Sequence, residues 1–238
     1  MVGFDNSYSY SDSFSLIESQ WDLIYQSYTD FIKDSLVMIS DKDEKIRREL
    51  RELAKNEPEE LVYSYFEDVK RNIYTYRSVF LNASLLFIFS HFENTMRLIE
   101  NETERLFPVK KKSKCSFCKN KGKSDKLQEI KQRIIKAAEL KDQVKDGLNE
   151  NWMTISDFYQ IRNKLTHNDG RFDDKKKNQH LVRRIKKVSP TFSYSKEQNK
   201  TLSVYISDQC LKTVSTLMDS YLKTLMDGVW ESYKANKA

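Results

Sequence analysis

Glycine and proline are scarce in this chain, whose 238 residues include 5 Gly and 3 Pro. Both residues mark turns and are common in folds built from many short strands. Their scarcity argues against a turn-rich all-β fold and favours long helices. Charged side chains make up 32% of the residues, but 39% of them are hydrophobic, which is enough to build a packed core instead of a disordered chain.

Apolar residues recur every three or four positions in five segments, and this spacing predicts an all-α helical bundle. The segments are Ser13 to about Ile39, Pro58 to the mid-70s, Ser78 to Phe107, Ser124 to Leu140 and Asp208 to Tyr233. A charged stretch at 41–56 predicts a separate exposed helix. Two β-prone segments, Thr191–Ser195 and Thr201–Ile206, predict a small β-hairpin before the C-terminal helix.

Two parts are expected along the chain: N-terminal helices over residues 1–76, and a main helical domain over 77–238 with a basic insertion at 108–125. The N-terminus lacks the basic and apolar segments of a secretory signal. The most apolar stretch, Val79–Phe89, is about half as long as a bilayer span. Three cysteines are too few for a disulfide framework. We therefore expect a cytoplasmic protein without a membrane partner.

The segment Ile155–Gly170 combines an apolar stripe with polar residues on other faces. Thr154 with Asp157 is typical of a helix start, and Asn168-Asp169-Gly170 of a helix end. The predicted stripe consists of Ile155, Phe158, Ile161 and Leu165. Asn163 and His167 lie four residues apart, on a face that points away from this stripe.

Arg162 and His167 carry the chemistry of this helix. Histidine exchanges protons near neutral pH, and the last turn of a helix favours its charged form. Arginine holds phosphate through two hydrogen bonds and keeps its charge. Structural roles remain open for both residues. His167 can be a structural histidine, and Arg162 can form a surface ion pair, for example with Asp157.

Arg162-Asn163, with four residues between Arg162 and His167, resembles the R-x4–6-H motif of the HEPN superfamily (higher eukaryote and prokaryote nucleotide-binding). The resemblance implies a metal-independent endoribonuclease that needs no cofactor, often a toxin or abortive-infection effector. It implies that Arg162 binds the scissile phosphate, that His167 is the acid/base group, and that Asn163 orients His167 or the substrate. Glu93, on the apolar helix, matches a polar residue near the family's site and is expected to position Arg162.

A homodimer is expected because Arg162 and His167 lie about 140° apart on one helix, so a single copy cannot easily surround a phosphate. A two-fold axis places two motifs opposite each other. The other expected partners are RNA and a cognate antitoxin or defence-system protein. The alternatives are a non-catalytic HEPN-like module that binds RNA or a protein, and a helical scaffold.

Two basic runs flank the motif and predict contacts with a nucleic-acid backbone, unless they are merely solvated. The residues chosen from them are Lys110, Lys111, Lys112, Lys114, Arg183 and Arg184. The first run also contains Cys115 and Cys118, whose spacing provides half of a tetrahedral zinc site. For these two cysteines a plain solvated loop and a redox pair are the alternatives to zinc.

Overall fold

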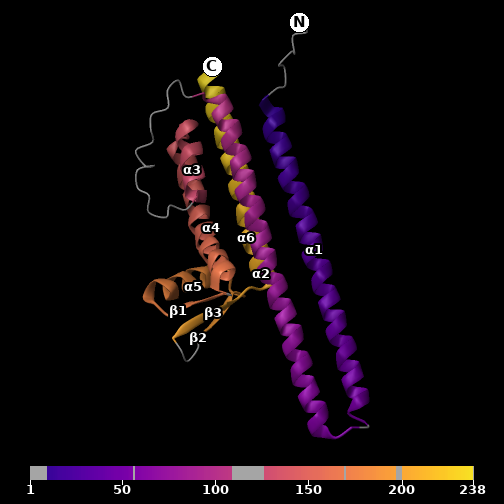
Figure 1. Cartoon of the computed structure of the whole chain (residues 1–238). Coiled ribbons are helices and arrows are strands. Elements are labelled where there is room, and N and C mark those ends of the chain that lie inside the picture. Colours follow the sequence, from indigo (N-terminus) through magenta and orange to yellow (C-terminus); the bar gives the residue numbers. More distant parts are fainter. Residues whose placement is uncertain (1–9, 56, 109–125, 169, 197–199, 238) are drawn as a thin grey trace. The chain divides into compact units, whose positions relative to one another are not determined.

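The computed structural model describes residues 10–55, 57–108, 126–168, 170–196 and 200–237 (Figure 1). The elements are α1 (Tyr10–Leu53), α2 (Glu59–Leu106), α3 (Lys126–Ala137), α4 (Asp142–Asn168), β1 (Arg171–Asp173), α5 (Lys176–Val188), β2 (Ser193–Lys196), β3 (Thr201–Tyr205) and α6 (Asp208–Lys237). The predicted all-α fold with a small β-hairpin before the last helix is confirmed. The basic insertion, including Lys110–Lys114, Cys115 and Cys118, lies outside the described residues.

Three helices differ from the prediction in their bounds. The charged stretch at 41–56 is not a separate helix, because α1 continues through it to Leu53. No Gly or Pro interrupts this stretch, and ion pairs one turn apart such as Arg47–Asp43 at 3.0 Å support it. The two predicted helices on either side of residue 77 are one helix, α2. Thr154 does not start a helix, since α4 already begins at Asp142.

The described chain divides into two compact units that alternate along the sequence. The first unit contains Met1–Ile24, Phe89–Ser156 and Ser215–Ala238, and the second contains Tyr25–Ile88 and Asp157–Val214. Consequently α1, α2, α4 and α6 each contribute residues to both units. The expected boundary between residues 76 and 77 lies inside α2, and the division of the chain at that point stays a prediction.

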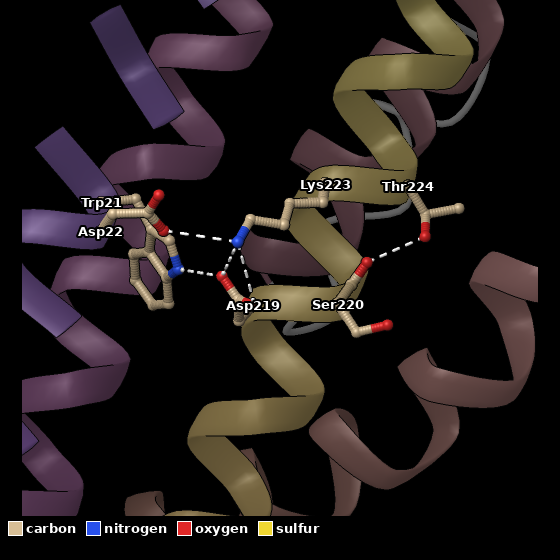
Figure 2. A network of polar contacts seen from close by, with 6 residues as sticks. All are labelled: Trp21, Asp22, Asp219, Ser220, Lys223 and Thr224. Carbon is tan, nitrogen blue, oxygen red and sulfur yellow. Dashed lines mark hydrogen bonds and ion pairs between the residues drawn. The ribbon is translucent and has the colours of Figure 1, made fainter. Parts of the chain in front are cut away.

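Buried aromatic rings hold the helices of the first unit together. The ring of Phe92 on α2 lies 6.3 Å from Trp21 on α1 and 6.0 Å from Tyr221 on α6. Trp21 also donates a hydrogen bond from Nε1 to Asp219 at 3.1 Å. Lys223 lies 3.2 Å from Asp219 and 3.5 Å from Asp22, so it bridges α6 and α1 (Figure 2). Aromatic packing and this polar network therefore bind α1 to α6 in this unit.

The second unit contains a helical hairpin and the sheet. Tyr28 on α1 donates a hydrogen bond to the carbonyl of Ser84 on α2 at 2.7 Å, and its ring stacks on Phe87 at 5.7 Å. The sheet is antiparallel in the order β1-β3-β2. Pairing of Phe172 with Leu202 places two buried side chains side by side. Among the described residues, no helix has the length and apolarity needed to cross a membrane.

One lysine of the first unit is buried without a carboxylate partner among the described residues. Lys131 on α3 is 2% exposed. Its Nζ donates to Asn149 Oδ1 at 2.8 Å and lies 4.8 Å from the centre of the Trp152 ring. Loss of hydration disfavours the ammonium, and burial lowers the pKa of Lys131 to about 8. This charge therefore reduces stability at neutral pH.

We expect Lys131→Met to stabilise the protein at pH 7 by about 1–3 kcal/mol, because it removes a buried charge and leaves the exposed Asn149 free to bind water. Between the folded pKa of about 8 and the unfolded value of 10.5, the unfolded chain binds more protons, so the wild-type free energy of unfolding rises with pH. Denaturant titrations from pH 7 to about 9.5 should show this rise in the wild type and in Lys136→Met, an exposed control on α3. A rise that persists in Lys131→Met contradicts the prediction.

Candidate functional site

The predicted motif lies in the last turns of α4, in the second unit. Phe158, Ile161 and Leu165 are buried, which confirms the predicted core stripe in this part of the helix. His167 is exposed, whereas Arg162 and Asn163 are half-buried. The helix therefore separates a packed face from a face that carries polar groups at its surface.

Two neutral side chains on α4 hold Arg162 in place. Its Nη1 donates to Asn163 Oδ1 at 3.0 Å, and its guanidinium carbon lies 5.6 Å from the centre of the Tyr159 ring. Its Nε is buried and has no hydrogen-bond partner in the described part of the chain. Among the described residues no carboxylate forms an ion pair with Arg162, so its positive charge is available to an anion.

Asp157, considered above as a partner of Arg162, is bound by a different arginine. Arg184 on α5 donates from Nε and Nη2 to the two carboxylate oxygens of Asp157, both at 2.6 Å. Asp157 and Arg162 lie five residues apart on one helix, about 140° around its axis, so their side chains diverge. The proposed Arg162–Asp157 pair is therefore wrong. The pair that does form raises the pKa of Arg184 and joins α5 to α4.

Gly170 ends the motif helix and connects it to the sheet. Its φ is +76°, a left-handed conformation that glycine adopts without strain. Its N–H donates to the carbonyl of Lys164 at 3.3 Å, and its carbonyl accepts from the N–H of Val204 on β3 at 3.2 Å. The turn that carries His167 is thus held against β3.

Glu93 is the one expected catalytic residue that lies in the first unit. It is part of α2, and its Oε1 is buried without a hydrogen-bond partner among the described residues. Arg162, Asn163 and His167 all lie in the second unit. The expected role of Glu93 in positioning Arg162 stays a prediction.

The two arginines expected to bind nucleic acid differ in their surroundings. Arg183 is exposed on α5, whereas its neighbour Arg184 is engaged by Asp157. The stretch Arg171–Ser189, for which no helix or strand was predicted, contains β1 and α5. The buried residues Leu181, Val182 and Ile185 were the available signal for this helix, since their spacing marks one apolar side among basic residues.

The described part of the chain contains no group of three or more His, Cys, Asp or Glu residues arranged to hold a metal ion. Cys210 is buried on α6, and burial raises the pKa of its thiol to about 11. It is therefore a poor nucleophile near neutral pH. The zinc hypothesis for Cys115 and Cys118 concerns residues outside the described ones and stays a prediction.

Comparison of the chain with family models, with curated proteins and with solved structures finds no match. The resemblance to the HEPN superfamily therefore depends on the motif residues and their surroundings.

We expect Gly170→Ala to lower the free energy of unfolding by about 1–2 kcal/mol or more, because alanine is strained at positive φ. In addition, its Cβ would lie 2.9 Å from Leu165 Cδ2. Gly147→Ala on the same helix is the matched control: a Cβ there meets no atom within 4 Å. Replacing a helical glycine by alanine should stabilise by about 0.5–1 kcal/mol. Chemical denaturation of both variants measures whether each substitution raises or lowers the free energy of unfolding. Equal effects would mean that the positive φ of Gly170 does not restrict which residue this turn accepts.

Proposed function

We propose that this chain is a metal-independent endoribonuclease of the cytoplasm, acting as a toxin or phage-defence effector. The observation that supports the proposal is that Arg162 is held in place without an acidic partner among the described residues. Asn163 and Tyr159 hold its side chain, yet no described carboxylate neutralises it. The exposed His167 follows on the last turn of the same helix. A fixed cation and an exposed histidine are groups that phosphoryl transfer without a metal requires.

RNA cleavage without a metal uses the 2′-hydroxyl of the substrate as the nucleophile. Its oxygen attacks the adjacent phosphorus while a base removes its proton, and the bond from phosphorus to the 5′-oxygen breaks as an acid protonates that oxygen. The products are a 2′,3′-cyclic phosphate and a 5′-hydroxyl. We assign the proton transfers to His167 and stabilisation of the phosphorane charge to Arg162.

The proposed enzyme is a homodimer, because base and acid act on opposite sides of the phosphorus and one chain supplies a single His167 in this motif. A two-fold axis through paired motifs would provide two histidines and two arginines in one cleft. RNA is then the substrate, and a cognate antitoxin or defence-system partner is expected to control the activity.

We predict that the purified protein cleaves RNA in the presence of EDTA and that His167→Ala lowers the rate by about 10²-fold or more, as loss of an acid/base group does. Thr166→Val is the matched control. Thr166 is the exposed neighbour of His167, and its hydroxyl donates to the backbone carbonyl of Arg162 within the helix, at 2.9 Å. The measurement is the appearance of 2′,3′-cyclic phosphate ends on a labelled oligoribonucleotide. Cleavage that EDTA abolishes and that His167→Ala leaves unchanged contradicts the proposal.

A second prediction concerns assembly. Light scattering should give twice the 28.3 kDa mass of one chain. Mixed dimers of wild type and His167→Ala should lose more than half of the activity, because each cleft needs both histidines. A monomer that remains fully active would refute the dimeric mechanism while leaving the assignment of His167 intact.

The alternative function, an RNA-binding module without catalysis, is favoured by one further observation. The exposed side of α5 carries several basic residues, and binding through them needs neither Arg162 nor His167. RNA binding with no EDTA-resistant cleavage would support this second candidate.

A further inference from the structure

Helix α5 has one apolar side and one basic side. Its buried residues are Asn178, Leu181, Val182 and Ile185. On a helix with 100° between residues, Lys176, Arg183 and Lys187 fall within about 40° of one another, opposite that buried side. All three are exposed. We call Lys176, Arg183 and Lys187 the α5 ridge.

The region around the ridge has a high positive charge. Residues 171–188 contain eight basic and two acidic side chains, which gives +6. The complete chain of 238 residues also has a net charge of +6. The remaining residues of the chain therefore balance to zero, and residues 171–188 form a strongly basic region of the described surface.

Cations outside the ridge form ion pairs with the acidic residues of this region. Lys175 lies 2.7 Å from Asp173, and Lys196 forms an ion pair with Asp174. Asp157 is bound by Arg184. Within the described ranges, the ridge residues themselves make no ion pair or side-chain hydrogen bond. The acidic residues of this region therefore form ion pairs with other cations, and the three ridge residues have no ion-pair partner among the described residues.

We propose that the α5 ridge binds the phosphate backbone of RNA and guides it to the motif at the end of α4, an inference that rests on the proposed function. From Lys176 to Lys187 the ridge spans twelve residues, about 16 Å along the helix axis, and so matches a linear polyanion several nucleotides long. No large apolar side chain lies between its members on the exposed side, whereas the core of a protein interface is rich in such residues.

Arg184 has a different task from the ridge, although it is adjacent to Arg183 in sequence. Its paired hydrogen bonds to Asp157 hold α5 on α4, and Asp157 lies on the same helix as Arg162 and His167. An arginine with both ends of its fork bound to a carboxylate has few donors left for phosphate. Arg184 therefore positions the ridge without belonging to it.

The experiment measures binding of the full chain to a 2′-O-methyl RNA 20-mer by fluorescence anisotropy at several salt concentrations. This probe has the RNA backbone but no free 2′-hydroxyl, so it binds without being cleaved. Each lost phosphate contact should lower the slope of log K against log salt by about 0.7. Arg183→Gln should therefore lower it by about 0.7, and Lys176→Gln, Arg183→Gln and Lys187→Gln together by about 2.

Two controls accompany these variants. Lys33→Gln removes an exposed charge from α1 in the same unit, and it should leave the slope unchanged. Arg184→Gln tests folding instead: it should lower Tm, since it leaves the buried Asp157 without its partner. Circular dichroism of each variant confirms folding, and the exposed position of the ridge residues predicts a wild-type spectrum for the triple variant.

Wild-type affinity and slope in the triple variant would overturn the proposal, as would the absence of binding by the wild type. Ridge-dependent binding to phosphatidylserine vesicles without binding to the 20-mer would also overturn it. The two proposals fail separately. Ridge-dependent binding without EDTA-resistant cleavage refutes the ribonuclease and keeps the ridge, whereas cleavage with an unchanged slope in the triple variant refutes the ridge alone.

Discussion

The ion pair between Arg184 and Asp157 decides how the second unit presents its charges. A buried carboxylate is stable only with a cation and hydrogen bonds around it, and Arg184 supplies both at 2.6 Å. The pair crosses from α5 to α4, so it sets the position of α5 as well. Asp157 lies about 140° around α4 from Arg162, so the pair uses no partner within reach of the motif arginine. One interaction thus places the basic helix beside the helix that carries the motif.

Most helices were predictable from the spacing of apolar residues, because that spacing records burial directly. Helix ends were harder to predict. The charged segment before Leu53 was predicted as a separate helix, yet α1 continues through it, since it contains no Gly or Pro that would break a helix. Helix α5 was missed because few apolar residues are scattered among many basic ones. The third strand, β1, pairs Arg171 with Ser203, a contact between distant residues that local patterns cannot reveal.

The candidate site was predictable in its residue positions but not in its partners. A helix with 3.6 residues per turn already places Leu165 inside and His167 outside, as observed. The partner of Asp157 is 27 residues away, so that choice depends on tertiary packing. Glu93 and Arg162 belong to different units, and the sequence alone offers no geometry that relates them.

The hydrogen bond between Arg162 and Asn163 affects how the two proposed catalytic groups, Arg162 and His167, lie on α4. Around the axis of α4, Arg162 and His167 are about 140° apart, but Asn163 lies between them, only about 40° from His167. The bond at 3.0 Å therefore draws the guanidinium toward the side of the helix that carries His167. Asn163 thus contacts the arginine, whereas it was expected to orient His167 or the substrate. The separation that remains is set by the helix itself, and for this reason the proposed mechanism needs the groups of a second copy.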